Sequence, residues 1–404
     1  MKPVNRLGAA SVLAAALLVA LAGPVLADPV LADPVLADPV LADVAPTAAA
    51  GSGPARSAVF VQTDNTVGNE IVAYHRDNAG RLTEAAAYPT GGRGGILADS
   101  VVDHLASQGS LALDEPVGLL IAVNAGSNSI SVFGVHGDRL GLRQVLSSGG
   151  AFPVSVAIRG DLAYVLNAED GGSVQGYRIG FGGLLPLPGS ARALGLDPAA
   201  TPQYTTTPGQ VAFSPAGSQL IVTTKANGND IDIFRVDPAG YLSAAPVVNT
   251  EPGTVPFAIT YDAAGHLVIA EAGTNELATF ELHATGTVAE LAAAGDAQSA
   301  TCWVTADGGL LFASNAGSAT VSAFAAGPGG SLTALGQTST DQGTVDSAIT
   351  PSGRFLYVQT GAGGIVDEFA VGAGGALTEI GTVTVPGAVG GEASRSADSH
   401  QCDA

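Results

Sequence analysis

The stretch Leu119–Leu140, LLIAVNAGSNSISVFGVHGDRL, has the pattern of a β-hairpin. An apolar run is followed by a tight polar turn at Asn124–Asn128, a second strand that ends at Phe133, and a Gly-Asp turn. Turn residues between two strand-like runs are a strong short-range signal for pairing of those runs. The sequence therefore predicts two antiparallel strands that meet at this turn.

The hairpin pattern recurs along the chain. Clear copies are LLFASNAGSATVSAF (Leu310–Phe324), HLVIAEAGTNELATF (His266–Phe280) and QLIVTTKANGNDIDIF (Gln219–Phe234), and weaker ones begin at Val59, Ala163 and Phe355. A further strand follows each copy, and another precedes every copy except the first. Seven self-similar units of about 40–45 residues predict an all-β, seven-bladed propeller whose blades each have four antiparallel strands.

No strand precedes the first copy, so the end of the chain is expected to supply the missing one. We expect Val383–Ala393 to complete the last blade and to continue into the first. A ring closed by both ends of the chain has no free sheet edges. The C-terminal strand is therefore predicted to complete blade 1.

Residues outside the repeats predict a secreted, extracellular protein. Met1–Ala27 has a short basic start, an apolar run and a Val-Leu-Ala end, as in a cleavable signal peptide. An uncleaved membrane anchor is the alternative, because the run is nearly long enough to span a bilayer. Residues 28–57 begin with PVLAD repeats and predict a disordered spacer. The propeller is expected over residues 58–394, with a disordered tail over 395–404.

Net charge and cysteine content limit the classes of partner and the disulfides that we expect for this chain. The formal net charge is −21, and only 13% of the residues are charged. Nucleic acid and anionic membrane repel such a chain, so neither is an expected partner after signal cleavage. A disulfide between Cys302 and Cys402 would have to join a buried strand to a polar tail, so we expect a free, buried thiol at Cys302. We expect a monomer that binds a small molecule.

Two blade connections are longer than the rest. Successive closing aromatics lie 59, 44, 57, 46, 44 and 45 residues apart, and the excess falls in residues 89–110 and 188–209. We call these segments the first and second insertions. Both belong to the face that carries the turns between second and third strands, the top face. Long loops over a propeller channel commonly bind ligands, although surface elaboration without function is the alternative.

Three residues on this face are candidates for catalysis. His104, beside Asp103 in the first insertion, could act as a general base, or the pair could simply pin the loop. Lys225 is the only lysine besides Lys2, and it lies in the top turn of the fourth blade. Glu271 lies in the equivalent turn of the fifth blade. Such a pair could hold a substrate carbonyl and activate water, or form a salt bridge between blades.

The remaining polar residues of the top face form the predicted binding set. Asn and Gly in the repeated turns are also suited to left-handed backbone conformations. Two carboxylates of the set could join backbone carbonyls around a divalent cation, but no ligand-spacing motif supports this, so no metal or cofactor is predicted. P-loop, HExxH, GxSxG and dinucleotide motifs are missing from the sequence. The binding set is Asn124, Asn167, Asn227, Asn315, Arg93, Gln108, Asp346 and Glu392.

The NAGS-type turns, the closing aromatics, the TVPFAI strand and three G-x-L-T segments (Gly80–Thr83, Gly330–Thr333, Gly375–Thr378) together resemble the seven-bladed lactonase-type propellers. This family includes bacterial 6-phosphogluconolactonase-like proteins and fungal 3-carboxymuconate cyclases. The resemblance covers about Ala58–Ala393. It implies ring opening of a lactone by water in the top-face channel.

The chain departs from the family in two respects. Where a Pro-His pair often opens an inner strand, this sequence has Pro153-Val154 and Pro256-Phe257. Cations are few on the top face, whereas a phosphorylated substrate requires an Arg/Lys cluster. The resemblance therefore implies a hydrolase for a non-phosphorylated lactone or cyclic ester. The alternative is a non-catalytic extracellular propeller that binds a ligand, such as a sugar-like molecule, or a protein.

Overall fold

The computed structural model describes residues 57–295, 297–388 and 394–397 of the 404-residue chain. The predicted signal peptide, the spacer up to residue 56 and most of the predicted tail lie outside these ranges. Within them, no helix combines the length and the hydropathy needed to cross a lipid bilayer.

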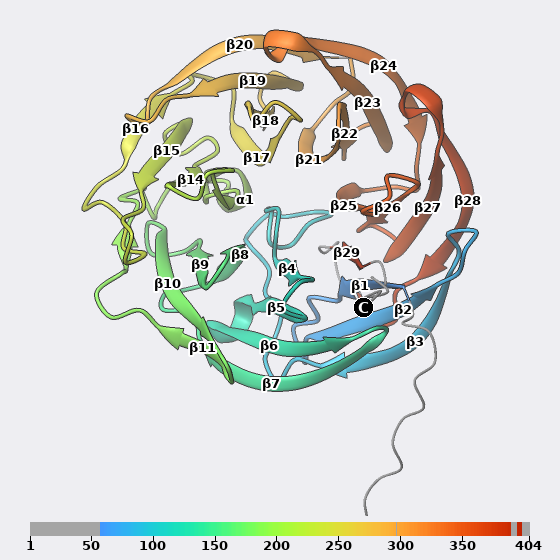
Figure 1. Cartoon of the computed structure of the whole chain (residues 1–404), viewed down its shortest axis with the longest axis horizontal. Coiled ribbons are helices and arrows are strands. Elements are labelled where there is room, and N and C mark those ends of the chain that lie inside the picture. The colour runs from blue at the N-terminus through green and yellow to red at the C-terminus, as the bar shows by residue number, and fades with distance from the viewer. Residues whose placement is uncertain (1–56, 296, 389–393, 398–404) are drawn as a thin grey trace, which may run out of the picture. The chain divides into compact units, whose positions relative to one another are not determined.

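Seven antiparallel sheets surround a central axis (Figure 1), as the repeats predict. Each sheet has four strands in sequence order, apart from blade 1, in which the last strand of the chain pairs with the first. Blade 3 carries an additional two-residue strand, β12 (Arg192–Ala193), that pairs with β10. The strands, from innermost to outermost in each blade, are β29 (Ser394–Ala397), β1 (Ala58–Gln62), β2 (Glu70–Arg76) and β3 (Leu82–Pro89) in blade 1; β4 (Leu111–Asp114), β5 (Leu119–Asn124), β6 (Ser129–His136) and β7 (Arg139–Ser147) in blade 2; β8 (Pro153–Arg159), β9 (Leu162–Asn167), β10 (Ser173–Gly180) and β11 (Gly183–Pro186) in blade 3; β13 (Val211–Phe213), β14 (Gln219–Thr223), β15 (Asp230–Arg235) and β16 (Val247–Thr250) in blade 4; β17 (Pro256–Tyr261), β18 (Leu267–Glu271), β19 (Glu276–Leu282) and β20 (Val288–Gly295) in blade 5; β21 (Thr301–Asp307), β22 (Leu310–Asn315), β23 (Thr320–Ala326) and β24 (Leu332–Ser339) in blade 6; and β25 (Thr344–Ile349), β26 (Phe355–Thr360), β27 (Ile365–Val371) and β28 (Leu377–Thr384) in blade 7.

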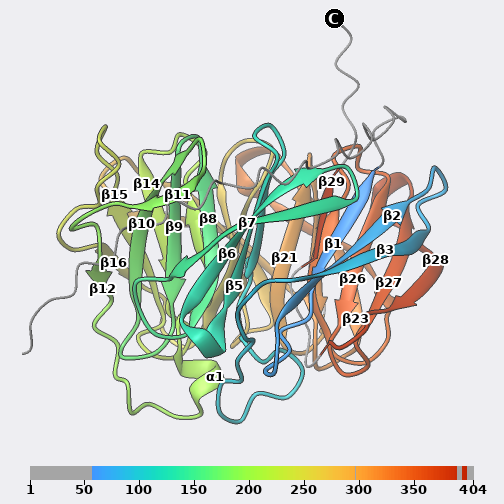
Figure 2. The same cartoon turned by 90° about the horizontal axis from the view of Figure 1, so that it is seen from below.

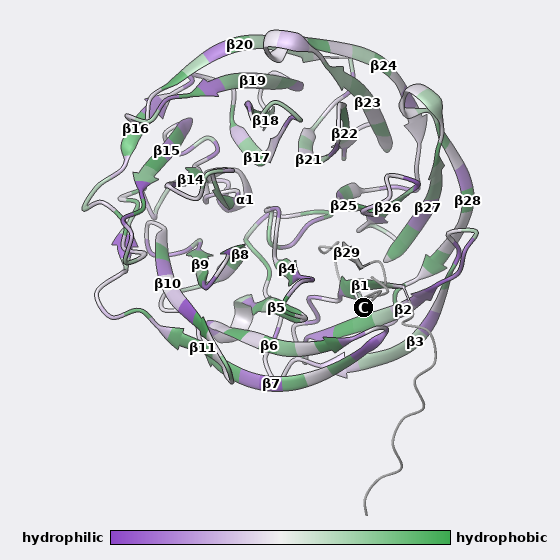
Figure 3. Cartoon of the chain, viewed as in Figure 1, coloured by the Kyte–Doolittle hydropathy of each residue, from purple (hydrophilic) through white to green (hydrophobic). Residues whose placement is uncertain are grey.

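The closing aromatics pack between neighbouring blades. Phe133 of blade 2 lies in one buried cluster with Phe60 of blade 1, and Phe369 of blade 7 lies in another with Phe312 of blade 6. In five blades the pairing of the third and fourth strands shifts register immediately before the aromatic. Each buried aromatic contributes roughly 1.5–3 kcal/mol through removal of its surface from water. The outermost strands alternate between hydrophobic and hydrophilic residues (Figure 3), because only one of their faces is covered.

The end of the chain closes the ring, but later than predicted. β29 pairs with β1, with Ala58 opposite Ala397 and Val61 opposite Ser394. Residues up to Thr384 belong to β28, the outer strand of blade 7, and the inner strand of blade 1 begins only at Ser394. The predicted boundary of the disordered tail at residue 395 is therefore wrong. The segment Ser394–Ala397 has no apolar alternation, so only its backbone pairing with β1 identifies it as a strand.

Both insertions leave the same face of the propeller. The second contains the short helix α1 (Gln203–Thr206), which lies at the lower edge of Figure 2. The first crosses the axis, where its trace reaches the centre of the ring in Figure 1. There the Gln108 side chain donates to the Val304 carbonyl (3.0 Å) and accepts from the Val304 amide (3.0 Å). The Trp303 indole donates to the Ser107 carbonyl at 2.8 Å. The first insertion thus joins blade 6 across the channel and does not hang above an open pore.

Candidate functional site

A cavity of about 310 Å³ lies where the two insertions meet the top ends of blades 4, 5 and 6. This volume falls in the range of about 300–1,000 Å³ that is typical of small-molecule sites. Most of the walls are apolar, and four of the lining side chains are titratable: Asp103, Tyr204, Lys225 and Cys302. The lining residues are Val101, Val102, Asp103, Ala106, Tyr204, Thr205, Lys225, Val255, Phe257, Ala272, Ala300, Cys302, Trp303, Ala316 and Gly317.

Lys225 is 1% exposed and ties the insertions to blade 4. Its Nζ donates to the carbonyls of Ala106 (2.7 Å) and Tyr204 (2.6 Å) and to Oγ1 of Thr207 (3.1 Å). Nζ also lies 5.3 Å from the centre of the Phe257 ring. Three acceptors match the three protons of an ammonium group. Burial lowers the pKa of Lys225 to about 7, and the neighbouring Asp103 carboxylate opposes that shift.

The direction of the Lys225 side chain follows from its register. Leu120 pairs with Phe133, and Leu220 pairs with Phe234, so Thr224 corresponds to Asn124 and Lys225 comes one residue later. Lys225 therefore does not stand at the position of the repeated Asn, which Thr224 occupies in blade 4. Lys225 has a left-handed backbone (φ 53°), which turns its side chain toward the first insertion.

Asp103 shapes the loop that forms one wall of the cavity. Its Oδ1 accepts from the amide of Leu105 (2.9 Å), and its Oδ2 accepts from the amide of Ser107 (3.0 Å). Burial raises the pKa of Asp103 to about 7, against the lowering effects of these hydrogen bonds and of Lys225. A carboxylate with a pKa near neutrality is suited to take a proton from water.

The floor of the cavity is aromatic and apolar. The rings of Phe257 and Trp303 meet edge to face, with centroids 5.0 Å apart. Cys302 is a free thiol, as predicted, and burial raises its pKa to about 12. It is therefore protonated at neutral pH and not a nucleophile. Cys402 lies outside the described residues.

Glu271 does not share this cavity. It occupies the position of the repeated Asn, which faces the preceding blade, and its Oε2 accepts from Oγ1 of Thr274 at 3.3 Å. Burial raises its pKa to about 7, with further contributions from neighbouring glutamates that include Glu276 and Glu251. The pKa of Lys225 is influenced by Asp103 and not by Glu271, and its three protons are donated elsewhere. The expected Lys225–Glu271 pairing is therefore wrong.

His104 also lies apart from the cavity walls, although its neighbour Asp103 lines them. The His104 carbonyl accepts from the amide of Leu97 at 2.9 Å, which helps to close the first insertion. The predicted trio of catalytic residues thus does not converge. Of the three, Lys225 alone is among the lining residues.

The asparagines that end the second strands hold neighbouring segments together and do not face a ligand. Asn124, Asn167 and Asn315 are completely buried. The amide oxygen of Asn124 accepts from Oγ1 of Thr90 (2.7 Å), and its Nδ2 donates to Oγ of Ser131 (2.7 Å). A buried amide can satisfy both donors and acceptors, so these positions stabilise the fold. Their predicted role in substrate binding does not agree with this burial.

The other members of the binding set are scattered. Arg93 is exposed and donates to the Gly126 carbonyl at 3.2 Å. Asp346 is buried and accepts from the amide of Ser347 at 2.8 Å. Glu392 lies outside the described residues. Among the residues that are described, no three His, Cys, Asp or Glu side chains are grouped as metal ligands.

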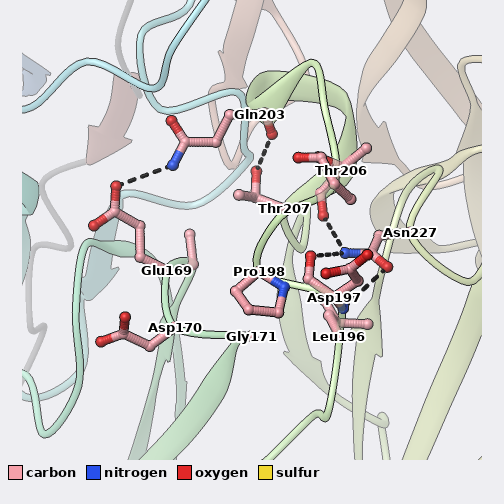
Figure 4. Close-up of a pocket in the computed structure, with 12 residues that line it drawn as sticks. Glu169, Asp170, Gly171, Leu196, Asp197, Pro198, Gln203, Thr206, Thr207 and Asn227 are labelled. Carbon is pink, nitrogen blue, oxygen red and sulfur yellow. Dashed lines mark hydrogen bonds between the residues drawn. The ribbon is translucent and has the colours of Figure 1, made fainter. Parts of the chain in front are cut away.

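A smaller cavity of about 160 Å³ lies between the second insertion and the top turn of blade 3 (Figure 4). Asn227 lines it and donates to the carbonyls of Asp197 (2.9 Å) and Thr206 (3.0 Å). Gln203 donates to Glu169 at 3.1 Å. These polar groups hold the second insertion on the blades, so Asn227 has a structural role in this wall.

Sequence reasoning missed Asp103 and Trp303 as members of the site. The sequence indicates Asp103 only as the neighbour of His104. Its bonds to amides two and four residues later form an Asx-type turn, for which an Asp before a Gly- and Ser-containing loop is a local signal. No local signal brings Trp303 to the same cavity, because it belongs to a blade on the other side of the axis.

Comparison with known proteins agrees with this architecture. The family model described as "Lactonase, 7-bladed beta-propeller" matches residues 271–402. The structure of a periplasmic gluconolactonase from Pseudomonas aeruginosa is 20% identical, has a TM-score of 0.66, and covers 85% of this chain and 99% of its own. A proposed 6-phosphogluconolactonase from Bacteroides fragilis is 19% identical, with a TM-score of 0.66 and coverage of 85% and 98%. Comparison with curated proteins finds no match.

At such identities, the likeness to solved structures shows the fold. The family model adds a sequence match over the C-terminal third of the chain. The chain is thus a seven-bladed propeller over the described blades, and its residues 271–402 match the lactonase propeller model.

Proposed function

We propose that this propeller hydrolyses a non-phosphorylated lactone or cyclic ester in the cavity beneath the first insertion. The observation that carries the proposal is that Asp103 and Lys225, which are buried and oppositely charged, line one cavity at the top of the channel. Buried titratable groups in a cavity are frequent at active sites. The resemblance to lactonase-type propellers supplies the reaction class.

In this proposal, Asp103 is the general base. Its carboxylate takes a proton from a water molecule whose oxygen attacks the lactone carbonyl carbon. The ring C–O bond then breaks, and the leaving alkoxide receives the proton back from Asp103. The three protons of Lys225 are already donated to protein acceptors, so its charge would stabilise the oxyanion through the field and not through a direct hydrogen bond.

The charge of the cavity favours a substrate without phosphate. Lys225 is the one Lys or Arg among the lining residues, and Asp103 offsets its charge. Recognition of a phosphate group generally uses several cationic side chains.

We further propose that the protein acts outside the cell as a monomer after removal of residues 1–27. The mass and the N-terminal sequence of the natural protein test this proposal.

The test is a hydrolysis screen of the purified protein against aldonolactones and alkyl lactones. We expect Asp103→Asn to lower kcat/KM by about 10²–10⁴. Asp232→Asn is the matched control, since Asp232 is also buried, also has a pKa raised by burial to about 7, and lies away from the cavity. Hydrolysis by the D103N variant at the parent rate would remove Asp103 from the mechanism. No turnover by the parent protein would exclude the enzyme.

One observation favours a second candidate, a propeller that binds a ligand without reaction. Each proton of Lys225 has a protein acceptor, which is the arrangement of a structural cation. Binding without turnover across the whole lactone panel would support this function. The two candidates are therefore separated by the same screen once binding is measured beside hydrolysis.

A further inference from the structure

The cavity beneath the first insertion has few polar groups left for a ligand. The Trp303 indole donates to Ser107, the Thr205 hydroxyl donates to the Pro202 carbonyl at 3.1 Å, and the three Lys225 protons are donated as described above. Both Asp103 oxygens accept backbone amides. A polyhydroxylated sugar ring would leave most of its hydroxyl groups without partners here, which is costly when they are buried.

The remaining walls are mostly hydrocarbon, with the Tyr204 phenol and the Cys302 thiol among them. Phe257 and Trp303 form an aromatic floor, and Val102 and Val255 flank it. Val101, which is 80% exposed on the first insertion, also lines the cavity. An apolar side chain on the surface beside an apolar cavity extends that apolar path to the solvent.

Small residues set the width of the cavity on the side of blades 5 and 6. Ala272, Ala316 and Gly317 belong to the top turns of these blades and line the cavity. The short side chains of the two alanines leave space that larger ones would occupy. The cavity therefore has a polar part at Asp103 and Lys225 and an apolar part bounded by aromatic and small residues.

From this division we infer that the ligand is a lactone with an unbranched alkyl tail, and that sugar lactones are poor ligands. The inference rests on the proposed function for the lactone ring and on the apolar walls for the tail. The ring would lie beside Asp103 and Lys225, and the tail beside Phe257 and Trp303.

Trp303 provides a direct measurement of binding, because it is the only tryptophan of the chain. We would titrate the purified protein with γ-lactones that carry alkyl tails of increasing length, and with glucono-δ-lactone, while following tryptophan emission. Each added methylene is expected to tighten binding about three- to fourfold until the cavity is full. Glucono-δ-lactone is expected to bind at least about tenfold more weakly than the best alkyl lactone.

Ala316→Leu is the informative variant, because Ala316 lines the cavity and leucine adds three carbons to that wall. It should shorten the longest tail that still improves affinity. Ala362→Leu is the matched control, since Ala362 is exposed in the corresponding turn of blade 7 and lies outside the cavity. Thermal unfolding of both variants confirms that they fold.

The outcomes separate this inference from the proposed function. Affinity that rises with tail length but without hydrolysis would support the apolar ligand and reject the enzyme. Hydrolysis of sugar lactones without a tail-length trend would support the enzyme and overturn the inference. Equal affinity for glucono-δ-lactone and alkyl lactones, or an unchanged tail-length limit in the Ala316→Leu variant, would also overturn it.

Discussion

The Nζ of Lys225 lies 2.7 Å from the carbonyl oxygen of Ala106, a residue 119 positions earlier in the chain. This bond joins the top turn of blade 4 to the first insertion, which begins after blade 1. The same ammonium group reaches the second insertion at Tyr204. One buried cation therefore holds together the three segments that surround the candidate site.

Replacement of Lys225 by Met is expected to destabilise the protein by about 2–4 kcal/mol, because three acceptors lose a charged donor inside the protein. Urea unfolding followed by tryptophan emission measures the change. Arg93→Met removes a charge from an exposed side chain and should stay within about 0.5 kcal/mol of the parent. An unchanged unfolding midpoint for the Lys225→Met variant would show that the cation does not stabilise the insertions.

Replacement of Gln108 by Leu is expected to cost about 1–3 kcal/mol, since the amide and carbonyl of Val304 both lose their partner near the axis. Hydrogen exchange at the Val304 amide should accelerate. Gln144→Leu is the control, because Gln144 makes the same pair of bonds to Leu184 in a half-buried position between blades 2 and 3. Equal losses in the two variants would argue against a special role for the crossing of the channel.

Stability should increase as the pH falls from about 7 toward 4.5. Burial raises the pKa of Glu271 from 4.5 to about 7, so in this window the folded protein binds a proton that the unfolded chain releases. The gain is on the order of 1–3 kcal/mol for this residue, and it is fully present below the unfolded pKa. Melting temperature against pH measures it, and Glu271→Gln should flatten the curve. A variant curve as steep as that of the parent would contradict this origin.

If Asp103 is the general base, kcat/KM should rise with pH through about 7, where burial places its pKa. The base acts only when it is deprotonated, so activity is lost as the pH falls below that value. Initial rates on one lactone between pH 5 and 9 measure the profile. The Asp232→Asn control should keep the rise, and a flat profile for the parent protein would assign the base elsewhere.

The propeller itself could be predicted from the sequence with few errors. Six copies of the hairpin around Asn124–Asn128, each closed by an aromatic residue, repeat one local pattern, and the blades follow it. The boundary of the last strand could not be predicted, because Ser394–Ala397 has no strand-like alternation of its own. Its position depends on the unpaired edge of β1, which lies at the other end of the ring.

The candidate site was predicted only in part. The sequence predicts Lys225 as a site residue, whereas it does not assign Asp103 and Trp303 to the site. A shift of one residue in register decides whether a side chain enters the neighbouring blade, as Glu271 does, or reaches the insertions, as Lys225 does. Such a shift changes the direction of the side chain without changing the hydrophobic pattern.

By itself, the sequence determined the number of blades, their four-stranded form and the face on which the two insertions emerge, because these depend on periodicity that is local to each unit. Only the tertiary structure decided that the first insertion crosses the axis and that Asp103, Lys225 and Trp303 line one cavity. These residues come from the first insertion, blade 4 and blade 6. Closure of the ring and folding of the insertion bring them together, and neither leaves a periodic pattern in the sequence.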